Sequence, residues 1–241
     1  MKIATYNILK GGSKRSHWAT MIEDHNVDLL LVQESYSRKE HLPSMLFPTM
    51  GESVWDKAEP NQWGSGIFSK TGSLKQIHVP RFNGWVVGSE IRDASWQSNI
   101  ETVFVFSIHA PAGNGGYAGQ VNLLLDEIAR ISNGKEVILG GDFNLTVSHW
   151  PESERPSSKK NLAIQERLDK EFGLINCWQE ANPNREPQQT LRWTRDRTTP
   201  YHCDGVFVPK YWKEQLQDCS ILSGECWNLL SDHNPVVATF T

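Results

Sequence analysis

Short runs of apolar residues recur along the whole chain, and most of them are too short to form helices. β-branched and aromatic residues dominate these runs, as in the segment from Thr102 to Ile108. Apolar runs of this length are typical of strands, and nearly continuous ones indicate strands that are buried on both faces. The pattern predicts strands over residues 3–9, 28–32, 66–68, 75–79, 84–91, 102–108, 136–139, 205–208, 217–222 and 235–240.

Three other segments have the apolar spacing of helices. Between residues 120 and 131 the apolar side chains recur at steps of three and four, which places them along one face of a helix. Residues 161–172 have a similar amphipathic pattern, and residues 18–25 form a third candidate helix with Ser16 as its cap. Many strands with few helices favour two packed sheets with the helices on the outside.

The composition is that of an ordinary globular protein. Of the 241 residues, 38% are hydrophobic and 22% are charged, which provides enough apolar surface for a sizeable core. No linker or low-complexity tract divides the chain, so we expect residues 1–241 to form a single domain. The formal net charge of −4 gives no general attraction to nucleic acid, and any affinity for phosphate must be local.

The sequence gives little indication of membrane segments, disulfide bonds or a cysteine-bound metal. No run of 18 apolar residues and no signal peptide are present, so we expect a cytoplasmic protein without a membrane span. The four cysteines form no Cys-x-x-Cys pair, and a structural zinc site is therefore not expected. We expect reduced and mostly buried thiols, with a bridge between Cys219 and Cys226 as the alternative.

Polar residues stand where several of the predicted strands end or begin. Active sites are commonly placed at strand ends, because a rigid sheet can hold loop residues in position there. We therefore expect these side chains to meet in one cleft. They are Asn7, Gln33, Glu34, His109, Asp142, Asn144, Asp204, Asp232 and His233.

The residue types in this set indicate phosphate ester chemistry. Glu34, Asp142 and Asp232 offer hard carboxylate oxygens, which suit Mg²⁺ or Mn²⁺. Asparagine amides can donate hydrogen bonds to a phosphate without adding negative charge. The imidazoles of His109 and His233 can move protons near neutral pH. The set fits metal-assisted attack of water on a phosphodiester or phosphomonoester.

Five short blocks of sequence carry these residues in a fixed order, and together they span residues 5 to 235. They are Thr5–Ile8, Val32–Ser35, Ser107–Pro111, Gly141–Asn144 and Ser231–Pro235, with a weaker sixth at Trp63–Ser69. The ordered set resembles the motifs of the endonuclease/exonuclease/phosphatase superfamily, which has the DNase-I-like fold. One block alone is weak, whereas ordered co-occurrence is specific. The resemblance implies an α/β (α+β) protein, namely a four-layer α/β/β/α sandwich of two packed mixed sheets flanked by helices.

The resemblance also implies a role for each matched position. Glu34 would be the main ligand of a Mg²⁺ or Mn²⁺ ion, with Asn7 organising metal and phosphate and Asp232 as an additional carboxylate of the metal site. The catalytic positions would be Asp142, which positions or deprotonates the attacking water; Asn144, which holds the phosphate; His233, the general base or phosphate-stabilising imidazole; Asp204, which orients His233; and His109, the second histidine of the DNase and phosphatase branches.

Two positions depart from the pattern of the superfamily. The block around Asp204 usually reads apolar-Asp-aromatic-apolar, whereas this chain has Cys203, Asp204, Gly205 and Val206. His109 stands where apurinic/apyrimidinic endonucleases generally carry a tyrosine. The histidine therefore argues against a dedicated abasic-site repair enzyme.

Each block also has an ordinary structural explanation. Residues 140–144 could form a turn after a strand, because Gly, Asp and Asn all favour turns. Glu34 could be a surface carboxylate at a strand end, and His109 could be a hydrogen-bonded turn residue. These explanations must all hold together and in the right order, so we prefer the catalytic interpretation.

Aromatic and basic residues near the predicted cleft are candidates for substrate binding. Trp150 follows the Asp142 loop, and Trp193 lies between Arg192 and Arg195. Interleaved aromatic and arginine side chains can stack on bases and bind phosphates. A packed tryptophan with solvated arginines is the alternative.

The sequence thus predicts a Mg²⁺-dependent phosphoesterase, most specifically a nuclease that hydrolyses DNA or RNA phosphodiesters. One alternative is a phosphatase or phosphodiesterase that acts on small or lipid phosphoesters. The lack of a signal peptide and of a long apolar hairpin weakens the lipid version. Another alternative is a catalytically silent binding module on the same fold, against which the complete set of candidate residues argues.

Overall fold

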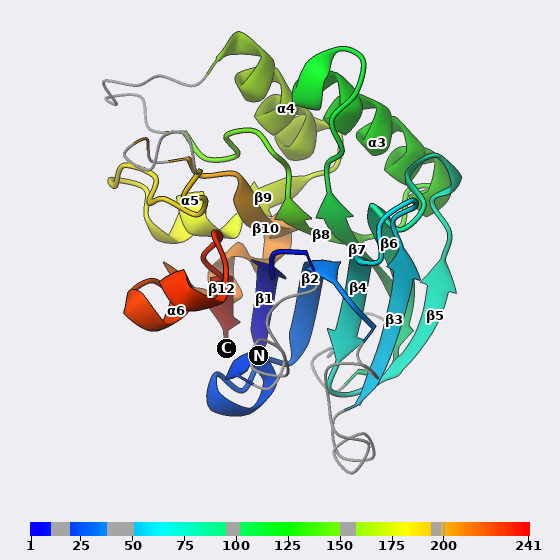
Figure 1. Ribbon diagram of the computed structural model, residues 1–241, viewed down its shortest axis with the longest axis horizontal. Helices are drawn as coiled ribbons and strands as arrows, with labels where there is room; N and C mark the ends of the chain where they lie inside the picture. The colour runs from blue at the N-terminus through cyan, green and yellow to red at the C-terminus, as the bar shows by residue number, and fades with distance from the viewer. Residues whose placement is uncertain (11–19, 38–50, 95–101, 150–157, 194–198, 200) are drawn as a thin grey trace.

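The computed structural model describes residues 1–10, 20–37, 51–94, 102–149, 158–193, 199 and 201–241. Two six-stranded sheets form its centre (Figure 1). The first sheet has the order β11 (Leu216–Ile221), β12 (Val236–Phe240), β1 (Lys2–Asn7), β2 (Leu29–Ser35), β4 (Gly64–Ser69) and β3 (Glu52–Lys57). The second has the order β5 (Ser73–Ile77), β6 (Val86–Arg92), β7 (Thr102–His109), β8 (Val137–Asp142), β10 (Asp204–Pro209) and β9 (Leu174–Asn176).

Both sheets are mixed, with one parallel pair in the middle of each. β1 runs parallel to β2 in the first sheet, and β7 runs parallel to β8 in the second. The other neighbouring strands are antiparallel. β1 and β12 are neighbours, so the two ends of the chain lie side by side (Figure 1).

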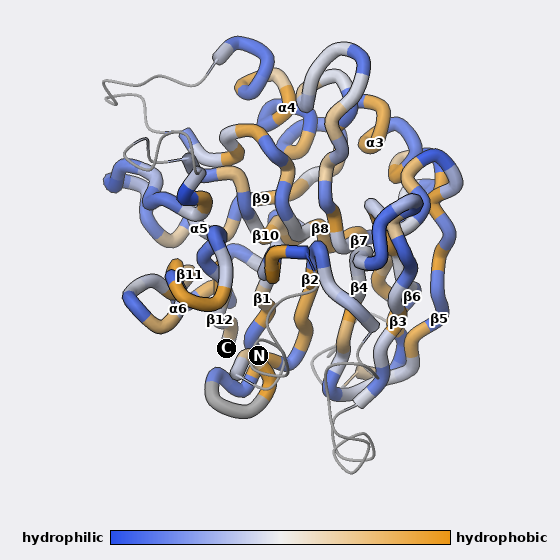
Figure 2. Tube along the Cα trace, in the orientation of Figure 1, coloured by the Kyte–Doolittle hydropathy of each residue, from blue (hydrophilic) through white to orange (hydrophobic). Residues whose placement is uncertain are grey.

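The central strands are apolar on both faces because both faces are covered. In β2, Leu29 and Leu31 contact the core between the two sheets, while Leu30 and Val32 contact a separate core on the outer face. This arrangement accounts for the continuous apolar run that predicted a buried strand here. Figure 2 shows the hydrophobic colour concentrated along these central strands.

Helices cover the outer faces and complete four layers. α3 (Gly116–Ser132) and α4 (Lys159–Lys170) pack on the second sheet, where Val121 and Ile164 join the core built on Phe106. The short π-helix η1 (Thr20–Asp24) and α6 (Glu225–Leu230) cover the first sheet, through Met21 and Trp227. The predicted four-layer sandwich of two mixed sheets and outer helices is confirmed.

The predicted elements are mostly present, with shifted ends and some omissions. The helix expected over 161–172 begins at Lys159, and the helix expected over 18–25 is only η1, with residues 11–19 outside the described part. Short elements escaped the sequence analysis because they have too few positions to show a period. These are β3, β9, α5 (Cys177–Ala181), α6 and the 3₁₀ turns η3 (Pro80–Phe82) and η4 (Lys210–Gln215).

The structure also bears on disulfide bonds and on membrane-spanning helices. All four cysteines lie in the described part of the chain, none is bridged, and only Cys226 is exposed. Among the described helices, none has the length and apolar character needed to cross a membrane.

Candidate active site

The four central strands end at the same edge of the sandwich, where they bring the predicted site residues together. Asn7 ends β1, Glu34 lies near the end of β2, His109 ends β7 and Asp142 ends β8. His109 and Asp142 are direct neighbours across the parallel pair. Asp204, the first residue of β10, stands opposite Asp142 on its other side. Two parallel pairs therefore create the cluster, since parallel strands end at a common edge.

The space between the sheets turns polar just below this cluster. The Gln33 amide nitrogen donates to Ser107 Oγ (3.0 Å), and Ser107 Oγ donates to the Val32 carbonyl (2.9 Å). Thr5 Oγ1 donates to Gln33 Oε1 (3.2 Å). These buried bonds tie the first sheet to the second directly beneath the site. They fix the separation of the strand ends that carry its residues.

Glu34 adopts a backbone conformation that strands normally exclude. Its φ is +51°, and the pairing of β2 with β4 changes register between Val32 and Ser35. A non-glycine residue in this region carries strain, and such strain is found preferentially at functional sites. The carboxylate is held by Asn7 Nδ2 on Oε1 (3.2 Å) and by the Lys10 amide on Oε2 (2.8 Å).

Asp142 lies at the centre of the cluster and is buried. Asn7 Nδ2 donates to its Oδ2 (3.1 Å), and the Asn144 amide donates to its Oδ1 (2.8 Å). Burial raises the pKa of Asp142 above its usual range, although the neighbouring His233 acts in the opposite direction. The strand residue just before it must be Gly141, because a Cβ there would lie 1.9 Å from the Ile108 carbonyl oxygen.

His233 and Asp204 form a buried imidazole–carboxylate pair. Asp204 Oδ2 lies 2.9 Å from His233 Nδ1, and His233 Nε2 lies 3.6 Å from Asp142 Oδ2. Burial alone would lower the pKa of His233, but the carboxylates of Asp204 and Asp142 outweigh it and raise the pKa to about 10. His233 is therefore an imidazolium at neutral pH in the metal-free protein.

His109 has the opposite electrostatic character. Its ring packs against Trp63 and Trp85, with ring centroids 5.5 Å and 5.1 Å away, and the two tryptophan rings also contact each other, with centroids 5.3 Å apart. Burial lowers the pKa of His109 to about 4. Its Nε2 lies 3.6 Å from Glu34 Oε1 and 3.8 Å from Asp142 Oδ2. One histidine of the site is thus neutral near pH 7 while the other is charged.

Asp232 reaches the site through the segment that precedes β12. Ser231 Oγ donates to the Asn7 carbonyl (2.8 Å), and the Asp232 carbonyl accepts from the Arg192 amide (2.8 Å). Asp232 Oδ1 is buried and has no hydrogen-bond partner among the described residues. An unpartnered buried carboxylate oxygen, on the residue that follows Ser231, is a group that a hard divalent cation would satisfy. The donor set present is therefore suitable for Mg²⁺ or Mn²⁺.

The candidate substrate residues have different environments. The Arg192 guanidinium contacts Asn234 Oδ1 and the carbonyls of Ser231 and His233, so it holds the segment that carries Asp232 and His233. Trp193 is 41% exposed and lies edge-on to Tyr201, with ring centroids 6.1 Å apart. Trp150 and Arg195 lie outside the described residues.

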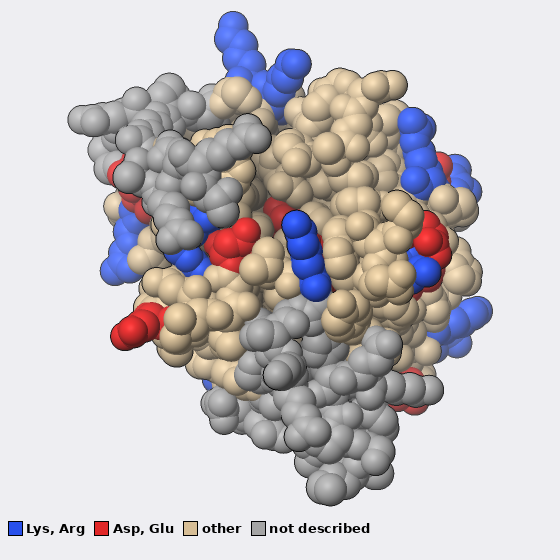
Figure 3. All heavy atoms as spheres, viewed as in Figure 1, with Lys and Arg blue, Asp and Glu red and all other residues tan. Residues whose placement is uncertain are grey.

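A hollow of about 530 Å³ adjoins the cluster at Asn144. Its wall is largely apolar with some polar groups, and it includes Tyr117, Lys160, Trp193 and Tyr201. Figure 3 shows acidic side chains near the middle of this face, with one basic side chain standing beside them. The described surface near the site is thus not a broad basic patch, in keeping with the net charge of −4.

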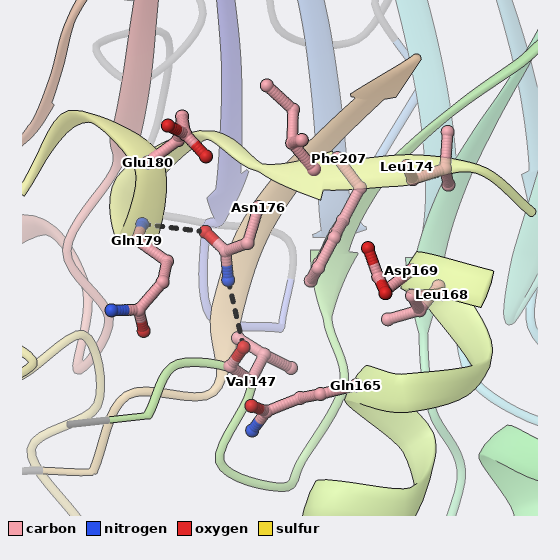
Figure 4. A pocket seen from close by; sticks show the side chains of 10 residues that line it. Val147, Gln165, Leu168, Asp169, Leu174, Asn176, Gln179, Glu180 and Phe207 are labelled. Atoms are coloured by element: carbon pink, nitrogen blue, oxygen red, sulfur yellow. Dashed lines mark hydrogen bonds between the residues drawn. The ribbon is translucent and has the colours of Figure 1, made fainter. Parts of the chain in front are cut away.

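A second cavity, of about 190 Å³, lies away from this chemistry, between α4, β9 and α5 (Figure 4). Its amide groups are already engaged. Asn176 Nδ2 donates to the Val147 carbonyl (2.8 Å), and Gln179 Oε1 accepts from the His149 amide (2.7 Å). These hydrogen bonds hold the loop after β8, and the residues that line this cavity include no set of catalytic groups.

The sequence analysis identified the acidic and histidine residues but missed some that hold them. Gln33 was noted only as a strand-end residue, and Ser107, Trp85 and Thr190 were not singled out. A signal for two of them is present, because Gln33 and Ser107 occupy inward positions two residues before the strand ends in an alternating pattern. Trp85 and Thr190 come from distant segments and have no such local signal.

Solved structures with the same fold include several nucleases by name. An AP endonuclease from Archaeoglobus fulgidus has a TM-score of 0.69 and 17% identity, with 100% of this chain and 99% of that chain covered. The catalytic domain of Xenopus laevis APE2 has a TM-score of 0.72 and 17% identity, with coverage of 100% and 91%. The endonuclease domain of TRAS1, a telomere-specific non-LTR retrotransposon, has a TM-score of 0.65 and 16% identity, with coverage of 99% and 97%. At these identities the likeness shows the fold.

The sequence itself is matched by one family model. No curated protein matches the chain. The model of the Endonuclease/Exonuclease/phosphatase family matches residues 4–211, which include Glu34, His109, Asp142 and Asp204. Fold, strand-end cluster and family match therefore agree, and the chain belongs to the Endonuclease/Exonuclease/phosphatase family, whose members hydrolyse phosphate esters.

Proposed function

We propose that this protein is a Mg²⁺- or Mn²⁺-dependent nuclease that hydrolyses phosphodiester bonds. The observation that carries the proposal is the position of Asp142 Oδ2. This one oxygen accepts from Asn7 and lies within 4 Å of both His109 Nε2 and His233 Nε2, beside the carboxylate of Glu34. A base, a cationic imidazolium and a carboxylate that can hold a metal thus surround one small volume.

Glu34 and Asp232 would hold the metal, and Asn7 would keep the carboxylates of Glu34 and Asp142 apart by donating to both. The metal would supply positive charge against the phosphate oxygens. Asp142 is suited to accept the proton of the attacking water, because its raised pKa makes it a stronger base than an exposed carboxylate.

The two histidines take different parts. His233, kept as an imidazolium by Asp204, faces the position of the negatively charged phosphate and stabilises the charge that develops there. His109 is neutral near pH 7, since its pKa is about 4. It can donate a hydrogen bond toward the leaving oxygen but cannot deliver a proton from a stable imidazolium. Asn144, whose backbone amide donates to Asp142, would hold the phosphate.

The hollow beside Asn144 supports nucleic acid as the substrate class. Tyr117 is 39% exposed and Trp193 is 41% exposed, and both line this hollow together with Lys160. Exposed aromatic rings with a nearby cation can stack on bases and contact the backbone of a single strand. Two of the solved structures named above are endonucleases by their descriptions, which favours the same class.

The test is hydrolysis of plasmid DNA, single-stranded DNA, RNA, inositol phosphates and sphingomyelin with Mg²⁺ and with excess EDTA. We expect nucleic acid cleavage that EDTA abolishes. Glu34→Gln should reduce it about a hundredfold or more at the same Mg²⁺ concentration. Glu214→Gln, which changes an exposed carboxylate in η4 at the far end of β10, is the matched control.

Several outcomes would contradict the proposal. Full activity in excess EDTA would show that hydrolysis does not depend on a divalent metal ion. Release of phosphate from inositol phosphates, without cleavage of any nucleic acid, would identify a small-molecule phosphatase. Glu34→Gln with unchanged activity would exclude Glu34 as a metal ligand.

A further inference from the structure

Cys203 lies against the two buried aspartates of the site rather than in the apolar core. One ligand atom each from Cys203, Asp142 and Asp204 lie within 4.8 Å of one another, and all three residues are buried. We propose that these side chains bind a thiophilic divalent cation, Zn²⁺ or Co²⁺, at a site separate from the oxygen ligands Glu34 and Asp232.

Asp204 gives an independent sign of a missing ligand. Its Oδ2 is taken by His233 Nδ1, whereas its Oδ1 is buried and has no hydrogen-bond partner among the described residues. Leaving a buried carboxylate oxygen unpartnered is destabilising. Two carboxylates and a thiol packed together, with one oxygen unsatisfied, form a site that a cation would complete.

The three donor atoms are close enough together for one cation to contact all of them. Zinc bonds of about 2.0–2.3 Å place neighbouring ligand atoms about 3.5 Å apart. Donor atoms that lie within 4.8 Å of one another therefore have to approach by roughly 1 Å, which side-chain rotation provides. Three protein ligands would leave the fourth position for water.

The surroundings of the three ligands are already ordered. Thr190 Oγ1 accepts from the backbone amides of Cys203 (2.9 Å) and Asp204 (3.1 Å), which fixes both residues. The Asn144 amide holds Asp142 Oδ1 (2.8 Å). Partners of this kind orient metal ligands and increase affinity.

Cys203 also provides access and selectivity. It lines the hollow of about 530 Å³, so an ion can enter from the side on which substrate would bind. On binding, the thiol releases its proton to solvent and its sulfur bonds to the metal. A thiolate ligand favours Zn²⁺ or Co²⁺ over Mg²⁺. Occupation would engage both Asp142 and Asp204, so we expect it to inhibit hydrolysis.

The test is titration of the metal-free full chain with Co²⁺, followed by near-ultraviolet absorption from thiolate-to-cobalt charge transfer. We expect one equivalent of Co²⁺ to produce the band, Zn²⁺ to displace it, and excess Mg²⁺ to leave it in place. Cys203→Ser and Cys203→Ala should abolish the band and weaken Zn²⁺ binding, measured by calorimetry, at least tenfold. Cys226→Ser and Cys177→Ser, which change one exposed and one buried thiol, should retain the band.

Absence of the band in the wild-type chain would overturn this proposal, as would its loss in Cys226→Ser with retention in Cys203→Ser. The absorption measurement needs no turnover, so it is decided independently of the proposed nuclease activity. Where the chain is active, Zn²⁺ should inhibit the Mg²⁺-supported reaction at least tenfold less in Cys203→Ala than in wild type.

Discussion

At the scale of single residues, the site is organised by opposite environments for groups of the same type. His109 is packed against two tryptophan rings and stays neutral, whereas His233 is paired with Asp204 and stays charged. Pairs of like groups whose environments separate their pKa values are typical of acid–base sites. The division of roles proposed above rests on this difference.

The first prediction concerns the carboxylate that holds His233. Asp204→Asn keeps the shape but removes the charge that maintains the imidazolium, so kcat should fall about a hundredfold or more while KM changes little. The fall in activity at alkaline pH should also move to lower pH, because the pKa of His233 would drop from about 10. The measurement is kcat and kcat/KM as a function of pH.

Asp218→Asn is the control for this variant, because Asp218 is exposed in β11. An Asp204→Asn protein with wild-type kcat and an unshifted pH profile would show that the His233–Asp204 pair is only structural.

The second prediction concerns His202, which is fully buried beside Trp178 and bonded through Nδ1 to the Gln188 carbonyl. Burial lowers its pKa from 6.5 to about 4. Between these values the unfolded chain binds the proton and the folded chain does not. The free energy of unfolding should therefore decrease as the pH falls from about 6.5 to about 4.

Urea unfolding across this pH range measures the effect. The His202→Asn protein should be less stable than wild type at pH 7. Its free energy of unfolding should decrease less steeply with falling pH, and the slope should differ from that of wild type by the contribution of about one proton. His78→Asn, at an exposed position, should keep the wild-type slope. An equal slope in His202→Asn and wild type would contradict the assignment.

At the scale of elements, the close approach of two central strands determines where the site residues stand. β8 packs against β2 through Gly140, where a Cβ would lie 2.5 Å from Leu31 Cδ1. The sheets are therefore close just below Asp142, and the polar bonds of Gln33 and Ser107 cross the same interface. Small side chains here let a carboxylate of one sheet reach an amide of the other.

The third prediction tests this contact. Gly140→Ala should reduce the free energy of unfolding by about 1–3 kcal/mol through overpacking. Leu31→Val removes the contacting methyl group, so the double variant should be more stable than the sum of the two single effects. Gly134→Ala, where nothing lies within 4 Å of the added Cβ, should cost only its backbone strain and should not couple to Leu31→Val.

Chemical denaturation of the four proteins gives the coupling energy. Simple additivity of Gly140→Ala and Leu31→Val would show that the sheets are not in contact at this point.

At the scale of the whole molecule, chain topology and net charge bear on substrate choice. β1 pairs with β12, so strands from the first and last parts of the sequence lie in one sheet, as we expect if residues 1–241 form a single domain. The net charge of −4 gives no long-range attraction to nucleic acid. Binding must then depend on a few local contacts, so affinity should be modest and should decrease with salt.

The fourth prediction is that duplex DNA is cleaved without marked preference for an abasic site. The structural neighbours include an enzyme described as an AP endonuclease, but at 17% identity the likeness shows the fold alone. His109 is buried against two tryptophans and neutral, and a neutral imidazole there serves an ordinary ester equally well. Matched duplexes with and without one abasic site measure the preference, in wild type and in Arg195→Ala.

Arg195→Ala should weaken binding to both duplexes alike and should reduce the salt dependence by about one phosphate contact. Strong selectivity for the abasic duplex would contradict the interpretation of His109.

The sequence by itself determined most of the strands, their buried character and the identity of most candidate site residues. Ordered blocks around Asn7, Glu34, Asp142 and His233 identified the family because each needs a particular residue type at a strand end, which is local information. The pairing of strands into two sheets, and with it the distances within the cluster, was decided only by tertiary structure.

The environment of each side chain was likewise decided by tertiary structure. Arg192 was a candidate for binding phosphate, and in the structure its guanidinium contacts the backbone of the Asp232 segment, for which no local signal exists. Cys203 was predicted to be a buried thiol and is one, but the carboxylates beside it come from another strand and from the next residue. Sequence specifies which groups are present, whereas their charge states and partners follow from burial and from contacts between distant segments, which only the folded chain creates.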